Sequence, residues 1–254
     1  VDRPRAVRNT RTALTADQAR HLIIHSAKAG DTLASLWASY LLLGARNGEL
    51  LGLTRSRVSL VPGMAQIDLS WAATSLPWRH GQKCKCTAGV KARWCNDREA
   101  AVPPAFEWYE IRGALAWTRP KTEKSRRIIP VPAPLDEVLR RHIAETPQNE
   151  WDLMWLSSSG LPLRHKRVLI RWRAALKDAG LPNVDLHTAR HTAATLLREC
   201  GVGPEVIASI LGHSKIDTTF GYVHVNAAQT QRAMDAYSSL LSLPGGYGEA
   251  AYKG

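Results

Sequence analysis

The sequence predicts an α+β fold that is mainly α-helical, with a small antiparallel sheet at one edge. Apolar residues recur at helical spacing through most of the chain, whereas strand-like alternation is confined to residues 57–76 and 106–130. The 254 residues suffice for one large domain or two small ones and for a substantial core, and no internal repeat is present.

The charge balance favours a polyanionic partner. Lys and Arg number 34 against 22 Asp and Glu, which gives a net charge of +12. Nucleic acid is the commonest partner of so basic a domain, and no basic amphipathic helix supports a membrane surface instead. No apolar run approaches the roughly 20 residues that span a membrane. The four cysteines do not resemble a secreted disulfide framework, so we expect a cytoplasmic protein.

The N-terminal region is predicted to be a linker followed by two helices. Residues 1–14 are basic and contain a proline, as in a linker or a DNA-touching arm. Thr15 and Gln18 can form a capping box for a helix over residues 16–29. The next helix, over residues 33–45, is apolar on nearly every face and is therefore expected to be buried.

An arginine follows this apolar helix directly. Buried guanidinium groups need an anion or a carboxylate partner, and Glu49 lies three residues after Arg46. The alternative is an ordinary surface ion pair between these two residues.

Two stretches show strand patterns. Residues 57–76 alternate apolar and polar side chains around a Pro-Gly pair, which predicts strand, turn and strand. Residues 106–118 return to this pattern. A basic turn then leads into a short strand that ends at Pro130, which predicts a β-hairpin with Lys121 at or near its tip.

Residues 77–105 form a cysteine-bearing insertion. The segment is polar and rich in turns and has neither helical nor strand periodicity, so we expect a long loop. Thiolates and imidazole suit zinc, and a loop without a core of its own would gain stability from such a site. Because Cys-x-Cys is a less common pair than Cys-x2-Cys, free thiols in a flexible loop are the alternative. The candidate ligands are His80, Cys84, Cys86 and Cys95.

Helices are also predicted in the C-terminal half. Apolar spacing indicates helices over residues 133–143, 167–179 and 226–243, and the tail 244–254 is expected to be flexible. Two tyrosines outside the segments discussed next, Tyr109 and Tyr237, are expected to lie in the core.

The segment 186–224 concentrates the polar groups that carry chemistry. An apolar stripe predicts a helix that presents His187 and Arg190 near its start, on one face. A second short helix is expected to end at Gly212. An imidazole and a phenol, those of His213 and Tyr222, follow on the next stretch.

Four stretches together resemble the tyrosine recombinase (phage integrase) family. GARNGELLGL is similar to the family's first arginine box, RPKTEKSRR to its lysine-bearing turn, HTARHTAATLL to its second box and LGHSKIDTTFGYVH to its Leu-Gly-His…Tyr signature. The resemblance covers roughly residues 15–243. The cysteine-bearing insertion is like that of integrases from phages and mobile elements of high-GC Gram-positive bacteria. The positions that match are Arg46, Lys121, His187, Arg190, His213 and Tyr222.

The resemblance implies a tyrosine-recombinase catalytic-domain fold over residues 15–225. It also implies a site-specific recombinase that cleaves and rejoins DNA through a 3′-phosphotyrosine, for integration or excision of a phage or mobile element. Covalent catalysis conserves the phosphodiester energy, and no metal or cofactor is required because arginines supply the positive charge.

Each matching residue receives a role by resemblance. Tyr222 would attack the scissile phosphate, and His187 would act as general base or positioning partner. Arg46 and Arg190 would clamp the two non-bridging oxygens, since a guanidinium matches phosphate geometry. Lys121 would protonate the leaving 5′-oxygen. His213 would donate a hydrogen bond to a phosphate oxygen, and Glu49 would orient Arg46.

The resemblance also implies partners. We expect double-stranded DNA attachment sites, a homotetramer on DNA that forms from free monomers, an accessory directionality factor and no membrane. Residues 226–243 would pack onto a neighbouring protomer, and a DNA-binding domain would precede residues 1–14. The setting would be the bacterial cytoplasm, at the nucleoid when bound to DNA. Lys124, Arg126 and Arg127 are expected to contact DNA phosphates, with solvated surface charges as the alternative.

Two other functions remain open at this point. The same chemistry would serve a type IB topoisomerase-like relaxing enzyme, although a helix after Tyr222 favours a recombinase. A non-catalytic DNA-binding module would keep only the basic groove. A covalent protein–DNA adduct separates the two catalytic functions from this third one.

Overall fold

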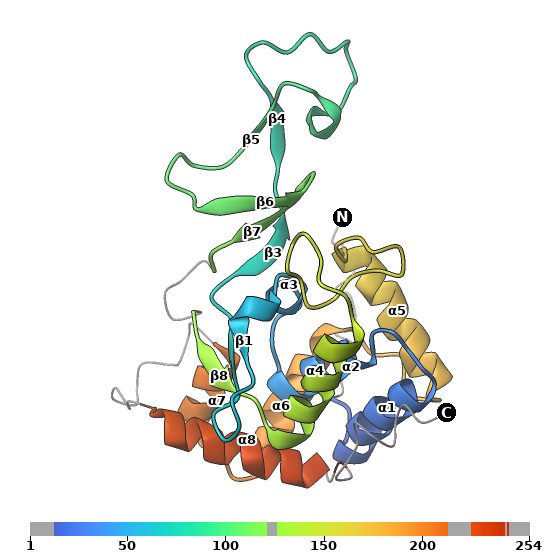
Figure 1. Cartoon of the computed structure of the whole chain (residues 1–254), viewed down its shortest axis with the longest axis vertical. Helices are drawn as coiled ribbons and strands as arrows, with labels where there is room; N and C mark the ends of the chain where they lie inside the picture. The colour runs from blue at the N-terminus through green and yellow to red at the C-terminus, as the bar shows by residue number, and fades with distance from the viewer. Residues whose placement is uncertain (1–12, 121–125, 213–224, 242, 244–254) are drawn as a thin grey trace, which may run out of the picture.

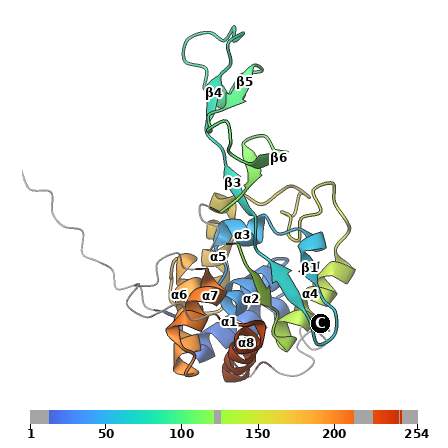
Figure 2. The same cartoon turned by 90° about the vertical axis from the view of Figure 1, so that its left-hand side faces the viewer.

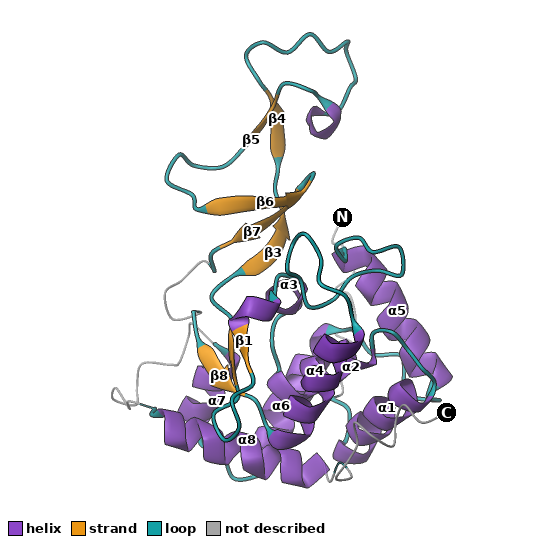
Figure 3. Cartoon of the chain, viewed as in Figure 1, coloured by secondary structure: helices purple, strands orange, loops and turns teal. Residues whose placement is uncertain are grey.

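The computed structural model describes residues 13–120, 126–212, 225–241 and 243. Helices gather into a body, and most strands form an arm (residues 72–118) that stands out from one end of it, as two perpendicular views show (Figures 1 and 2). Coloured by secondary structure, the body is mostly helix, and the arm is strand and loop with one short helical turn at its tip (Figure 3). The predicted α+β class, mainly helical with small antiparallel sheets at one edge, is confirmed.

The body is built around one apolar helix. All ten residues of α2 are buried, as its apolar faces predicted, and α1, α4 and α6 pack against it. The predicted capping box of α1, between Thr15 and Gln18, is present. The helices are α1 (Ala16–Lys28), α2 (Ala34–Leu43), α3 (Asn47–Leu51), α4 (Ala133–Glu145), α5 (His165–Asp178), α6 (His187–Glu199), α7 (Pro204–Leu211) and α8 (Ala227–Leu241), with 3-10 turns at Arg55–Arg57 and Ala92–Trp94.

The strands form three small antiparallel sheets. One sheet, in the body, has the order β1-β2-β8, the second has the order β3-β7-β6, and β4 pairs with β5 alone. The predicted strand, turn and strand within 57–76 correspond to β1 and β2. The strands are β1 (Val58–Ser59), β2 (Gln66–Asp68), β3 (Ala72–Ser75), β4 (Trp78–His80), β5 (Arg98–Ala100), β6 (Trp108–Arg112), β7 (Leu115–Thr118) and β8 (Ile128–Pro130).

The prediction of a β-hairpin that ends at Pro130 was wrong about which strands pair. Strand β7 pairs with β3 and β6, whereas β8 pairs with β2, so the two strands belong to different sheets. Burial explains the separation, because Ile129 lies opposite Ile67 and both side chains enter the core of the body. Lys121 lies outside the described residues.

The insertion contains strands that the sequence did not predict. Strands β4 and β5 are each three residues long, too short to show an alternating pattern. They pair from Trp78 opposite Ala100 to His80 opposite Arg98. The insertion is therefore a paired hairpin at the far end of the arm rather than a long loop.

Helix α8 completes the core of its own chain. Met234, Tyr237 and Leu241 are fully buried, and the Tyr237 hydroxyl donates a 2.6 Å hydrogen bond to the carbonyl of Leu41. This packing differs from the expectation that residues 226–243 serve a neighbouring protomer. Tyr237 is a core aromatic as predicted, but Tyr109 is 58% exposed and that expectation was wrong. Within the described parts of the chain, no helix combines the length and apolar character needed to cross a bilayer.

The buried hydroxyl of Tyr237 gives a first prediction. Tyr237→Phe leaves the Leu41 carbonyl without this donor, so the free energy of unfolding should fall by about 1–2 kcal/mol. Urea denaturation followed by far-UV circular dichroism measures the change. Tyr109→Phe removes an exposed hydroxyl and should change stability by less than about 0.5 kcal/mol. Equal losses in the two variants would contradict the packing of α8 described above.

Candidate active site

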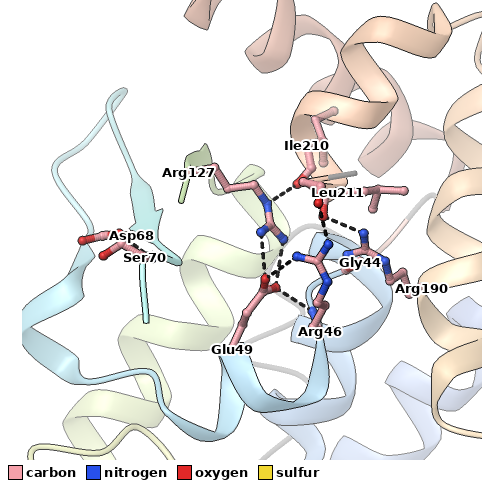
Figure 4. Close-up of polar contacts among 10 residues, drawn as sticks. Gly44, Arg46, Glu49, Asp68, Ser70, Arg127, Arg190, Ile210 and Leu211 are labelled. Carbon is pink, nitrogen blue, oxygen red and sulfur yellow. Dashed lines mark hydrogen bonds and ion pairs between the residues drawn. The ribbon is translucent and has the colours of Figure 1, made fainter. Parts of the chain in front are cut away.

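Three arginines meet at the C-terminal end of α7 (Figure 4). The last carbonyls of a helix have no partner within the helix and carry partial negative charge, so guanidinium groups both satisfy and stabilise them. One arginine comes from the start of α3, one directly precedes β8 and one lies on α6. The bonds run from Arg127 Nε to Ile210 O (2.6 Å), from Arg190 Nη2 to Leu211 O (2.6 Å) and from Arg46 Nη2 to Gly212 O (2.5 Å).

A buried carboxylate links two of these arginines. Glu49 is 2% exposed and accepts hydrogen bonds from Arg127 Nη1 and Nη2, both at 2.9 Å, and from Arg46 Nη1 at 2.8 Å. It also accepts from the backbone N–H of Arg46, which caps the start of α3. Burial alone would raise the pKa of Glu49, but Arg127 and then Arg46 outweigh it and hold the pKa below its usual value. The contact expected between Glu49 and Arg46 is present, within a larger network than a surface pair.

Arg127 is placed differently from the prediction that it contacts DNA. Its side chain is only 7% exposed, and all three of its guanidinium nitrogens bond to Glu49 or to the Ile210 carbonyl. The structure therefore makes Arg127 a residue that positions Glu49 and the end of α7. Its neighbour Arg126 is exposed, which is compatible with a phosphate contact.

Two glycines allow this close approach. Gly44 ends α2 with φ of 57°, and Gly212 ends α7 with φ of 69°, a conformation that side chains disfavour. A Cβ on Gly44 would lie 2.5 Å from Leu211, and one on Gly212 would lie 2.7 Å from Arg127 Nη1. The Gly44 carbonyl accepts a 2.9 Å hydrogen bond from Arg190 Nη1, so Arg190 joins the ends of both helices.

Arg190 is held in an environment that suits an anion. Burial, followed by the positive charges of Arg46 and Arg127, lowers the pKa of Arg190 to about 9. Arg46 and Arg190 each use two of the five N–H donors of a guanidinium in the contacts above. Among the described residues, both side chains thus retain donors for a further acceptor.

One cavity brings together three of the six residues that the sequence singled out. Arg46, His187 and Arg190 line the same hollow, of about 430 Å³. His187 is exposed on the first turn of α6, one helical turn before Arg190. The other three residues lie outside the described parts of the chain; they are Lys121, His213 and Tyr222. The predicted DNA contact Lys124 lies outside them as well.

The cavity also contains residues that sequence reasoning missed. Asn47 connects two of them, because it accepts a hydrogen bond from the Tyr40 hydroxyl and lies within hydrogen-bond distance of His165 Nδ1. Asn47 follows Arg46 directly, so its place beside the site could have been read from the chain. His165 starts α5, 118 residues later, and no spacing links it to Asn47.

A second hollow, of about 520 Å³, lies beside the start of α5. It is lined by the loop around residues 156–163 and by arginines from β6, from the residue before α5 and from α5 itself. Such a concentration of guanidinium groups is suited to phosphate oxygens. The arginines are Arg112, Arg164, Arg167 and Arg171.

The cysteine-bearing insertion places its four candidate ligands together. The ligand atoms of His80, Cys84, Cys86 and Cys95 all lie within 4.8 Å of one another. All four cysteines of the chain are free. Cys200, the fourth cysteine, lies apart on the body, where its thiol approaches the Ala236 carbonyl at 3.6 Å.

Comparison with known proteins finds integrases. Residues 106–229 match the model of the phage integrase family. An integrase from Saccharopolyspora erythraea is 28% identical over 212 residues, which are 73% of this chain and 48% of that protein. An integrase from Streptomyces ambofaciens is 30% identical over 215 residues, which are 80% of this chain and 46% of that protein. The chain is similar to the phage integrase family over residues 106–229 and to these two integrases over most of its length.

Solved structures show the same fold. The Tn1549 transposon integrase in complex with transposon right end DNA superposes with a TM-score of 0.60 at 20% identity, over 92% of this chain and 68% of that one. XerA recombinase superposes with a TM-score of 0.56 at 20% identity, over 91% and 65%. The chain spans about half the length of the curated integrases it matches.

Glu49 gives a second prediction. Glu49→Gln leaves Arg127 buried without its counter-charge, so the free energy of unfolding should fall by about 3 kcal/mol at neutral pH. Urea denaturation at several pH values measures the loss. Because the folded pKa of Glu49 is lowered, its contribution is complete above the unfolded value near 4.5 and is lost as pH falls through the folded value.

The control for this prediction is Glu99→Gln. Glu99 pairs with Arg79 on the surface, with 46% and 65% of their side chains exposed. That substitution should cost less than about 1 kcal/mol. If the difference in free energy of unfolding between the wild type and Glu49→Gln were to widen below pH 4, the conclusion that buried Glu49 is ionised would be contradicted.

Proposed function

We propose that this chain is the catalytic part of a site-specific DNA recombinase of the integrase type. It cleaves and rejoins double-stranded DNA through a 3′-phosphotyrosine, for integration or excision of a phage or mobile element. The observation that carries the proposal is the cavity in which Arg46, Arg190 and His187 face the same space. The similarity of the chain to integrases supports the same function.

The two arginines suit the non-bridging oxygens of a phosphodiester. Both guanidinium groups are fixed by backbone carbonyls, so they are oriented before any DNA arrives. Preorganised donors of this kind stabilise the charge that develops on a pentacoordinate phosphorane transition state. The pKa of Arg190 is lowered by burial and then by repulsion from Arg46 and Arg127, and an anion between Arg46 and Arg190 would offset that repulsion.

The covalent step uses residues beyond the described part of the site. The Tyr222 phenolate would attack the phosphorus and form the 3′-phosphotyrosine, while the 5′-oxygen leaves with a proton from Lys121. His187 would take the phenolic proton or position the phenol, and His213 would donate to a phosphate oxygen. Reversal by a different 5′-hydroxyl rejoins the strand, so the phosphodiester energy is conserved.

The surroundings of the site fit duplex DNA. The arginine-lined hollow at the start of α5 and the exposed Arg126 offer contacts to phosphates on either side of a scissile bond. Helix α5 begins with His165, which lines the catalytic cavity, and it also carries Arg167 and Arg171 of the second hollow. A DNA backbone running past the start of α5 could contact residues of both hollows.

The partners follow from this function. The chain would act on attachment sites in double-stranded DNA, assemble from monomers into a homotetramer on DNA and respond to an accessory directionality factor. The cellular site would be the bacterial cytoplasm, at the nucleoid. The named integrases among its relatives, and the Tn1549 integrase solved with transposon DNA, support a recombinase rather than a topoisomerase-like relaxing enzyme.

The covalent intermediate gives a third prediction. Incubation with a library of nicked duplexes of varied sequence should yield a complex that survives SDS and contains the chain bound to a DNA 3′ end. Sequencing of the trapped DNA would identify the site. Tyr222→Phe should abolish the adduct because it lacks the phenolic oxygen, whereas Tyr109→Phe, on the exposed surface of the arm, should retain it. An adduct that persists in Tyr222→Phe would refute the proposed nucleophile.

The arginine geometry gives a fourth prediction. Arg46→Lys keeps the charge but loses the planar fork, so the rate of adduct formation should fall on the order of 10²-fold. Single-turnover kinetics at saturating DNA isolate this step from binding. Arg140→Lys, on the exposed face of α4, is the matched control and should react at the wild-type rate. Equal rates for the wild type and Arg46→Lys would exclude a bidentate role for Arg46.

A further inference from the structure

We propose that the tip of the arm (residues 78–100) is a zinc-binding module, with one structural Zn²⁺ held by His80, Cys84, Cys86 and Cys95. The module lies at the end of the arm furthest from the helical body (Figures 1 and 2). The inference does not depend on the recombinase function.

The ligand atoms already have nearly the separations that zinc requires. Cys84 Sγ lies 3.1 Å from His80 Nδ1 and 3.4 Å from Cys95 Sγ, and the largest separation within the cluster is below 4.8 Å. Tetrahedral zinc with Zn–S near 2.3 Å and Zn–N near 2.0 Å sets its ligands roughly 3.5–3.8 Å apart. Movements of about an ångström or less would therefore complete the coordination.

The imidazole of His80 is oriented as a metal ligand. Its Nε2 lies 3.0 Å from the carbonyl of Val90, so an Nε2–H donor there leaves the Nδ1 lone pair directed toward Cys84. Histidine ligands commonly donate their second ring N–H to a carbonyl, which fixes the tautomer and the ring orientation. The described contacts of His80 match that arrangement without further rotation.

The backbone of the module also supports thiolate ligands. The N–H of Cys86 points to Cys84 Sγ at 3.3 Å, and such a donor stabilises a sulfur that carries negative charge. Cys95 is 1% exposed and follows a 3-10 turn, with its N–H bonded to the Ala92 carbonyl at 3.0 Å. The backbone around Cys84 and Cys86 and the 3-10 turn before Cys95 thus place the three thiols close together.

The tip lacks the apolar core that would hold it without a metal. Between residues 78 and 100, Gly81 and Cys95 are the buried positions, while Trp94 is 72% exposed. The two strands share three residue pairs, and an isolated two-stranded hairpin is marginal in water. A structural zinc supplies folding free energy directly, which fits a segment that cannot bury enough apolar surface.

The charge around the cluster is complementary. Zn²⁺ with three thiolates and a neutral imidazole carries a net charge of −1. Basic residues dominate the same loop, and their charge offsets that of the metal site. They are Lys83, Lys85, Lys91 and Arg93, all exposed.

The test measures metal content and thiol protection in the full chain, purified under reducing conditions. We expect about one zinc ion per chain by elemental analysis, and Co²⁺ substitution should give the thiolate charge-transfer and d–d bands of a tetrahedral site. Cys86→Ser and Cys95→Ser should each lose the metal and these bands. The matched control, Cys200→Ser, changes a cysteine outside the module and should retain both.

Folding of the variants is checked independently of the metal. The thermal transition of the helical body should remain in Cys86→Ser, because the tip contributes nothing to the main core. In the wild-type protein, a chelator should expose the three thiols of the cluster to alkylation and residues 82–94 to proteolysis, with no change at Cys200. This measurement tests the site even if both variants fail to fold.

Three results would overturn the proposal. The first is substoichiometric zinc together with no saturable binding of Zn²⁺ or Co²⁺ under reducing conditions. The second is a disulfide between Cys84 and Cys95 in the purified protein, which would take two of the four ligands. The third is equal loss of metal in Cys200→Ser, which would place the metal elsewhere.

Discussion

The structure depends on the charge compensation at the C-terminal end of α7. Burial, and then the charges of Arg46 and Arg127, lower the pKa of Arg190, and such a cluster of guanidinium groups would separate without compensation. The compensation comes from one buried carboxylate, Glu49, and from the unpaired carbonyls where α2 and α7 end. Five elements, α2, α3, α6, α7 and β8, therefore meet at one point, and glycines at the two helix ends make the approach possible.

The three arginines have different roles because they differ in how many N–H donors remain available to a ligand. All three guanidinium nitrogens of Arg127 donate hydrogen bonds to Glu49 or Ile210, and its side chain is almost fully buried. Arg127 is therefore poorly placed to bind a ligand. Arg46 and Arg190 border a cavity and keep N–H donors, so they can bind an anion. One carboxylate against three guanidinium groups leaves a charge excess at that cavity. Because Gly212 immediately precedes His213, the same network fixes where the chain leaves α7 toward Tyr222.

Local sequence patterns predicted the parts of this site that lie within single elements. The spacing of His187 and Arg190 places both on one helical turn, and Glu49 lies against Arg46 through a capping contact. Local patterns could not predict that Arg127, and not Arg126, is buried, because the buried one is determined by Glu49, a carboxylate 78 residues away. Lys121, His213 and Tyr222 receive their roles from the resemblance and lie outside the described residues, while Tyr40 and His165 needed the tertiary structure. The pairing of β8 could not be predicted for a similar reason, because β8 pairs with β2, a strand far away in the sequence, where Ile129 and Ile67 are buried opposite each other.

Stability alone does not account for a buried Glu49–Arg127 pair. Desolvation of two charges costs about as much as their attraction returns, and apolar residues of similar volume often replace such pairs with no loss of stability. An apolar replacement would, however, remove the carboxylate that orients Arg46 and the guanidinium that holds the end of α7. Arg46 and Arg190 would then lose their fixed geometry at the cavity. The ion pair is thus best explained as the support of two oriented arginines, with its energetic cost met by the apolar core around α2.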